Sequence, residues 1–187
     1  MKRVPLSVPV GFALGLVLLA AASSGRGRSS TAAATEGPSI EEMAARVKAL
    51  EALLPSQSHL MTDVGEHFAN LWFAGRAENW PLADFCLAET RSHLHWAVRR
   101  IPIRKDSQGQ DIHLEPILEA FENSQLAQLK KAIDDQDGDA FESTYKESLT
   151  VCYACHKASD KPYLRLRVPT EPASRILQFD PKADWPR

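Results

Sequence analysis

Apolar residues recur at helical spacing along most of the chain, and no stretch alternates between polar and apolar residues for long. In an α-helix each residue turns about 100° from the one before it, and residues 58–74 show the pattern that this rotation produces. The apolar side chains then share one arc, which contains Leu60, Met61, Val64, Gly65, Phe68, Leu71 and Trp72. A second helical stripe lies near the C-terminus and contains Phe141, Tyr145, Leu149, Cys152 and His156. The pattern therefore predicts amphipathic helices.

Local start and stop signals set the ends of these helices. Ser39 and Glu42 have the spacing of a capping box, and Pro55 ends the helix that they start. Ser56 or Ser58 can cap the second helix, and Asn79, ahead of a Trp-Pro pair, opens the third. Asp137, within an acidic turn, or Asp139, just after it, caps the last helix. The expected helices cover residues 39–54, 58–74, 79–101, 116–135 and 137–159, with a polar loop at 104–111.

The short connections between the last four helices favour antiparallel neighbours. We therefore expect an all-α fold, an antiparallel four-helix bundle with an additional N-terminal helix and an irregular Pro-rich C-terminal tail. The expected parts are a signal peptide at 1–24, a flexible linker at 25–38, the helical domain at 39–159 and an extended tail at 160–187. In the tail, Leu164, Leu166 and Val168 alternate with arginines, which predicts a short strand-like segment.

The N-terminus has the pattern of a secretory signal. Lys2 and Arg3 precede an apolar run from Val8 to Ala22, and small residues follow that run. The run is shorter than the about 20 residues that a membrane helix usually needs. We expect export to the periplasm or an equivalent compartment, and an uncleaved segment would instead anchor the protein to a membrane.

Composition narrows the class of partner. The chain of 187 residues carries 22 Lys and Arg against 24 Asp and Glu, a formal net charge of −2. This balance argues against a nucleic-acid partner. There are three cysteines, and if two of them serve a cofactor, Cys86 has no partner for a disulfide. Cys86 lies on the apolar arc of its helix, so we expect a buried, inert thiol.

The strongest chemical signal is Cys152-Tyr153-Ala154-Cys155-His156, which reads C-x-x-C-H. At this spacing two thiols attach one haem covalently, and the adjacent imidazole ligates its iron. On a helix, Cys152, Cys155 and His156 share one face. A redox dithiol beside a histidine is the alternative interpretation. We expect one covalently bound haem c, with His156 as a ligand of the iron.

The second axial position decides between functions. Met61 lies near the centre of the apolar arc of its helix, so it is the expected sixth ligand, although methionine on such a face is usually packing material. His67, at the border of the arc, and His93 are the alternatives. Phe68 and Trp72 are expected to line the haem site. Glu89 and His93 are one helical turn apart, which more often indicates a structural contact than a functional one.

The segment from Asp137 through Phe141 to the C-x-x-C-H motif, together with residues 60–68, resembles the class II cytochromes c. This family contains the four-helix cytochromes c′, and its haem motif lies near the C-terminus. The resemblance covers roughly residues 58–156 and implies that Met61 occupies the position that faces the open side of the haem iron. The chain departs from the family at Asp160, where an arginine is common, and in continuing well beyond the motif.

From these features we expect an exported monohaem cytochrome that transfers single electrons to and from redox partner proteins and is not an enzyme. If Met61 does not bind, the open iron would instead bind NO or CO as a sensor or scavenger. Peroxide reduction is a third alternative, with His67 as the candidate acid–base residue. The sequence leaves the partners, the spin state and a homodimer open.

Overall fold

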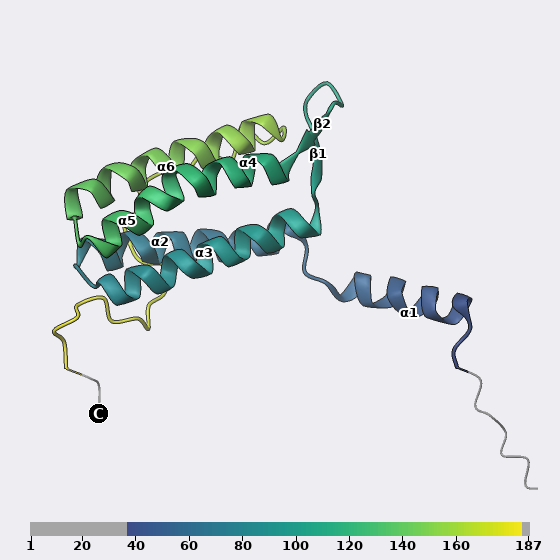
Figure 1. Cartoon of the computed structure of the whole chain (residues 1–187), viewed down its shortest axis with the longest axis horizontal. Coiled ribbons are helices and arrows are strands. Elements are labelled where there is room, and N and C mark those ends of the chain that lie inside the picture. The colour runs from purple at the N-terminus through teal and green to yellow at the C-terminus, as the bar shows by residue number, and fades with distance from the viewer. Residues whose placement is uncertain (1–36, 185–187) are drawn as a thin grey trace, which may run out of the picture. The chain divides into compact units, whose positions relative to one another are not determined.

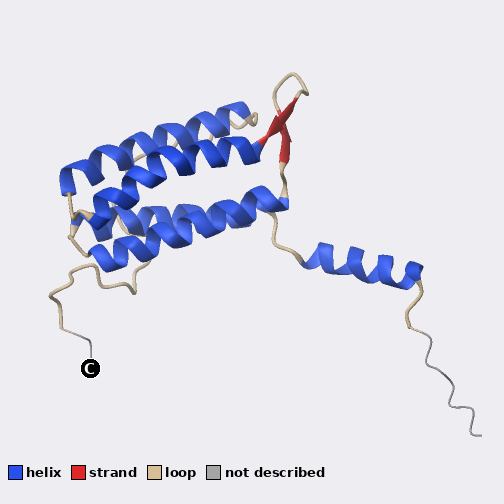
Figure 2. Ribbon diagram, viewed as in Figure 1, coloured by secondary structure: helices blue, strands red, loops and turns tan. Residues whose placement is uncertain are grey.

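The computed structural model describes residues 37–184. The predicted signal peptide and the predicted linker up to residue 36 lie outside the described residues. The described chain is mostly helical, as expected for an all-α protein, and a short β-hairpin is its only sheet (Figure 2). Its elements are α1 (Ile40–Leu53), α2 (Gln57–Arg76), α3 (Trp80–Arg100), β1 (Ile103–Lys105), β2 (Asp111–His113), α4 (Leu114–Phe121), the π-helical turn η1 (Glu122–Leu126), α5 (Ala127–Asp134) and α6 (Gly138–Ala158).

Side-chain caps begin four of the helices. Before α1, Ser39 and Glu42 each accept a hydrogen bond from the backbone N–H of the other. Ser56 caps α2 by accepting from the His59 N–H, and Asn79 caps α3 by accepting from the Leu82 N–H. Asp137 caps α6 through the Ala140 N–H, so the last helix begins one residue after the predicted cap.

Four helical rods pack around a common core: α2, α3, the continuous run α4–η1–α5, and α6. Figure 1 shows α2 beside α3, and α6 beside α4 and α5; contacts of α2 with α6 and of α3 with α5 join the two pairs. Aromatic rings fill the space between α2 and α6. Phe68 stacks on Tyr145 with centroids 4.4 Å apart, and the Tyr145 hydroxyl donates to the Phe68 carbonyl.

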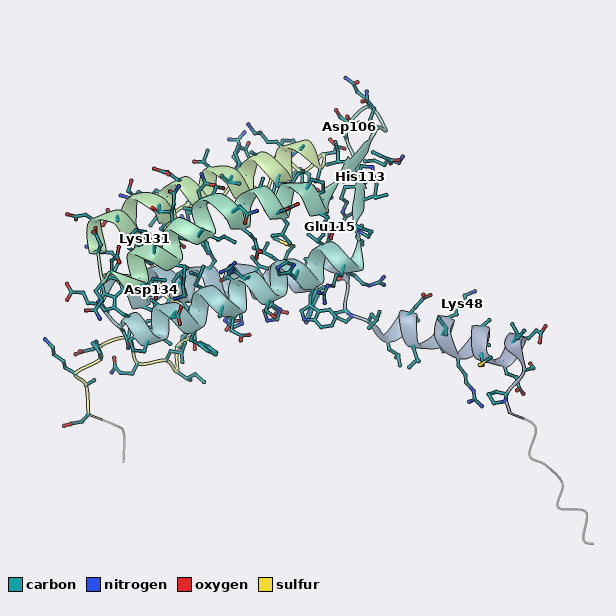
Figure 3. All side chains as sticks on the ribbon, viewed as in Figure 1. Lys48, Asp106, His113, Glu115, Lys131 and Asp134 are labelled. Atoms are coloured by element: carbon teal, nitrogen blue, oxygen red, sulfur yellow. The ribbon has the colours of Figure 1, made fainter. Side chains whose placement is uncertain are left out.

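Two local predictions were wrong. The expected polar loop at 104–111 is part of an antiparallel hairpin, in which Ile103 pairs with His113 and Lys105 with Asp111. Figure 3 labels Asp106 at the turn of this hairpin, where its carboxylate accepts from the Gln108 and Gln110 N–H groups. The expected strand-like segment in the tail is absent, because residues 161–184 contain no strand.

The tail nevertheless has fixed contacts with the rods. The Asn70 side chain, which is buried in α2, accepts from the Ser174 N–H at 3.0 Å. The Asn79 amide donates to the Phe179 carbonyl, and the Phe179 ring packs 6.0 Å from that of Phe73. Polar side chains from two positions of the chain thus hold the tail along α2 and the start of α3.

None of the helices described between residues 37 and 184 is long and apolar enough to cross a membrane.

Candidate functional site

The C-x-x-C-H motif lies in the last two turns of α6, where helical geometry brings its three functional side chains onto neighbouring faces. Cys152, Cys155 and His156 are all partly buried. All three line a small cavity of about 110 Å³, and Cys152 and His156 also line an adjoining cavity of about 640 Å³. The motif thus opens into the interior between the rods.

The larger cavity has the volume of a small-molecule pocket and a mostly apolar lining. Its volume lies within the about 300–1,000 Å³ that is typical of small-molecule pockets. α2, α3, α6 and the tail all contribute to its wall, and apolar side chains make up most of it. Its apolar residues include Met61, Phe68, Leu94, Tyr145, Leu149 and Leu164.

Met61 lines both cavities, together with Cys152 and His156. The structure therefore brings the predicted sixth ligand into the same space as the motif. The two alternatives, His67 and His93, line neither cavity. Instead their rings stack on each other, with centroids 5.2 Å apart.

Of the two predicted aromatic residues, Phe68 lines the larger cavity, whereas Trp72 lines neither. Trp72 lies one helical turn beyond Phe68, and its ring packs 4.9 Å from that of Tyr145 and 6.5 Å from that of Phe141. Trp72 thus contacts the aromatic core behind the cavity.

The His156 ring has a backbone partner. Its Nδ1 atom lies 3.4 Å from the carbonyl oxygen of Leu164, a residue of the tail. If Nδ1 carries the proton and donates it to this carbonyl, Nε2 keeps its lone pair and is the nitrogen able to ligate a metal. The tail thereby helps to set the orientation of this imidazole.

Burial shifts the pKa of both thiols of the motif upward. Burial raises the pKa of Cys152 to about 12, and burial also raises the pKa of Cys155. Redox-active C-x-x-C pairs have the opposite property, a thiol pKa below the ordinary value. The environment of these cysteines therefore disfavours the redox-dithiol interpretation.

Basic side chains gather at the cavity, a feature that sequence analysis missed. Arg104, Lys161, Arg165 and Arg167 line the larger cavity. The Arg104 Nε donates to the side-chain oxygen Oε1 of Gln57 at 2.7 Å, while the Nε2 of the buried Gln57 side chain donates to the backbone carbonyl of Ala97 at 2.8 Å. Arg165 and Arg167 belong to the alternating segment of the tail, but their position beside Arg104 at the cavity depends on contacts between distant parts of the chain.

Cys86 is buried on α3 with 1% of its surface exposed, which confirms the expected buried thiol. It lines neither cavity. Nearby, His67, Glu89 and His93 lie close enough for one donor atom from each to be within 4.8 Å of the others.

In comparisons with known proteins, no protein-family model, no curated protein and no solved structure matches the chain.

Proposed function

We propose that this chain is a monohaem c-type cytochrome that transfers single electrons. One observation carries the proposal: Cys152, His156 and Met61 line the same two adjoining cavities, and Cys155 joins them in the smaller one. Thioether bonds from Cys152 and Cys155 would hold the haem. His156 would ligate the iron from one side, and Met61 from the other.

The lining of the cavity also supports this proposal. A haem has an apolar ring system and two propionate carboxylates. The cavity combines apolar walls with Arg104, Lys161, Arg165 and Arg167, which are the cations that carboxylates bind best. Three of the four come after the motif, so the tail supplies cations where Asp160 departs from the pattern of the family.

Bound in this way, the haem would supply a ferric–ferrous couple, whose potential depends on the axial ligands and on burial. The residues of the chain around the haem would set the potential of this couple. A methionine thioether from Met61 would favour ferrous iron and, by ligating it, would exclude a substrate. A carrier of electrons, rather than an enzyme, is the function that this ligand set supports.

The arrangement of the rods supports a finer proposal about the fold. We infer an antiparallel four-helix bundle like that of the class II cytochromes c, preceded by the helix α1 and followed by the docked tail. Support comes from the three-residue connections between α2 and α3 and between α5 and α6, which reverse the direction of the chain. The position of the motif at the end of the last helix also agrees with that family.

Location and partners follow as proposals from the sequence. The basic start and the apolar run of residues 1–24 indicate export to the periplasm or a similar compartment, where soluble redox proteins would be the partners. Mass spectrometry of the mature N-terminus decides whether the segment is removed or remains as an anchor.

The decisive test is covalent attachment. The full chain is expressed in a host able to attach c-type haem, and haem is detected after denaturing electrophoresis. We expect a haem-positive band for the wild type, none for a Cys152→Ala/Cys155→Ala variant, and an unchanged band for Cys86→Ala as the matched control. A wild-type protein without covalent haem would refute the proposed function.

A further inference from the structure

A second cluster of chemically active side chains lies between α2 and α3, outside the cavities described above. Each helix contributes a carboxylate and an imidazole spaced four residues apart: Asp63 and His67 on α2, and Glu89 and His93 on α3. This spacing places the two groups of a pair on one helical face. Because α2 and α3 are joined by only three residues, they run in opposite directions and the pairs meet head to tail.

We propose that these residues form a binding site for one divalent transition-metal ion, with the properties of a zinc site. His67, Glu89 and His93 would be the ligands. Their donor atoms already lie within 4.8 Å of one another, although the three residues come from two helices. The His93 Nε2 atom is 3.8 Å from the nearer Glu89 oxygen, too far for a hydrogen bond and close to the separation of two ligands on one ion.

His93 supplies an independent observation. Its Nδ1 atom is buried and has no hydrogen-bond partner among the described residues. An oxygen of the Asp63 carboxylate lies 3.7 Å from it, beyond hydrogen-bond distance. A buried polar atom without a partner normally costs free energy, and such an atom calls for a functional explanation.

Metal binding at Nε2 explains this arrangement. A metal-bound histidine usually donates its other ring N–H to a carboxylate, which fixes the tautomer and orients the ring. Asp63 is placed for this role toward His93, and a contraction of less than 1 Å would complete the hydrogen bond. Asp63 is then a positioning residue, whereas His67, Glu89 and His93 contact the ion.

The donor set selects the class of ion. Two imidazole nitrogens and one carboxylate suit zinc, whereas calcium and magnesium prefer sites made of oxygen ligands alone. Copper(II) would compete, because affinity for such ligands rises toward copper along the first row. Three protein ligands leave one position of a tetrahedral ion for water.

The site is separate from the proposed haem cavity. Asp63, His67, Glu89 and His93 line neither cavity, so the ion would join α2 to α3 without contacting the motif on α6. An ion that binds only the folded chain stabilises it in proportion to its concentration and affinity. The inference is independent of the proposed function, because its ligands do not include the residues that would hold haem.

The test titrates zinc chloride into the tag-free full chain, purified with its bound cofactors, and measures heat of binding. We expect one zinc ion per chain in the presence of excess magnesium. Glu89→Gln and His93→Ala should abolish this binding, and Asp63→Asn should weaken it by about 10-fold to 100-fold, the usual effect of losing an orienting partner. His59→Ala, which removes an exposed histidine of α2, should leave zinc binding unchanged.

Two further measurements make the result specific. X-ray absorption at the zinc edge should show nitrogen and oxygen neighbours at about 2.0–2.1 Å, with the signature of imidazole. Zinc should raise the thermal unfolding midpoint of the wild type but not that of Glu89→Gln, which conserves the shape of the side chain. Absence of stoichiometric zinc binding, or binding that survives both Glu89→Gln and His93→Ala, would overturn the proposal.

Discussion

At the scale of single residues, Met61 decides how the proposed haem site works. It is partly buried on α2 and lines both cavities with Cys152 and His156, whereas His67 and His93 line neither. The structure thus supports Met61 over the histidines as the sixth ligand. The contact between His156 Nδ1 and the Leu164 carbonyl favours the tautomer that leaves Nε2 for the iron.

The first prediction is that Met61→Leu converts six-coordinate, low-spin iron to five-coordinate, high-spin iron. The potential should fall, because the thioether that favours ferrous iron is gone, and CO should then bind the ferrous protein. The fold should survive, since a Leu–Met exchange costs less than about 1.5 kcal/mol. Visible absorption and a redox titration measure both effects.

The matched control is Met43→Leu, which makes the same exchange in α1 at a residue that lines neither cavity. Its spectrum should equal that of the wild type. An unchanged spectrum in Met61→Leu would exclude Met61 as a ligand. A wild-type protein that is already high-spin would favour binding of NO or CO over electron transfer.

The second prediction concerns Cys86 and pH. Burial, followed by the charge of Glu89, raises the pKa of this thiol from 9.0 to about 11. Between pH 9 and pH 11 the unfolded chain therefore loses the proton that the folded chain retains. The retained proton of Cys86 therefore stabilises the fold fully below pH 9. This stabilisation should be lost, and the free energy of unfolding should fall, as the pH rises from 9 to 11.

Urea unfolding of the wild type and of Cys86→Ala, measured from pH 8 to pH 11, isolates the effect. The variant should start lower, because it leaves a small cavity, but its stability should fall less steeply above pH 9. Parallel curves for the two proteins would show that Cys86 titrates normally.

At the scale of elements, the close approach of α2 and α6 depends on a glycine. A Cβ atom on Gly75 would lie 2.3 Å from Cε1 and Cζ of Phe141, whose ring is fully buried. The Trp72, Trp80 and Tyr145 rings surround that ring, with centroids between 6.1 and 6.5 Å away. Phe141 therefore has little room to move.

The third prediction is that Gly75→Ala destabilises the protein. Alanine favours helix by about 1 kcal/mol, but overpacking a core costs about 1–3 kcal/mol or more, and a contact of 2.3 Å makes the clash the larger effect. Gly138→Ala, at the start of α6, is the control, because no atom outside its own stretch of backbone lies within 4 Å of its added Cβ. Urea midpoints should fall for the first and stay equal or rise for the second.

The elements also show what local sequence can predict. The caps at Ser56, Asn79 and Asp137 were predictable because each acts on the backbone within three residues. The π-helical turn η1, which lies inside the expected fourth helix, could not be predicted from local sequence. Its first residue, Glu122, accepts from Arg91 at 3.3 Å and lies 3.1 Å from His95 Nε2, so contacts with α3 surround it. The hairpin strands have three residues each, too few for a visible alternation.

The candidate site divides in the same way. Cys152, Cys155 and His156 come from one helical face, so spacing alone predicts that they lie together. Gln57 and Arg104 are 47 residues apart, and their contact depends on how α2, α3 and the hairpin pack. The pairing of His67 with residues of α3 likewise depends on the register between two helices.

At the scale of the whole molecule, the tail after α6 lines the same cavity as the motif on α6. Asn70 and Asn79, which bind the tail at Ser174 and Phe179, lie about 100 residues earlier in the chain. Between the motif and Ser174, the tail passes along the larger cavity. There the tail contributes three cations, Lys161, Arg165 and Arg167, to the proposed haem environment. The segment after the motif would thus shift the reduction potential of the haem as well as cover part of its cavity.

The fourth prediction is that Arg165→Gln/Arg167→Gln lowers the reduction potential. Positive charge near the haem disfavours the ferric form, which carries one charge more than the ferrous form, so removing two cations favours oxidation. The shift should be on the order of tens of mV at low salt and should shrink as ionic strength screens these exposed side chains. Arg175→Gln removes a charge from the same tail at a residue that does not line the cavity, and its potential should stay near that of the wild type. Equal shifts in the two variants would show that net charge alone acts, and no shift in either would place the haem away from this part of the tail.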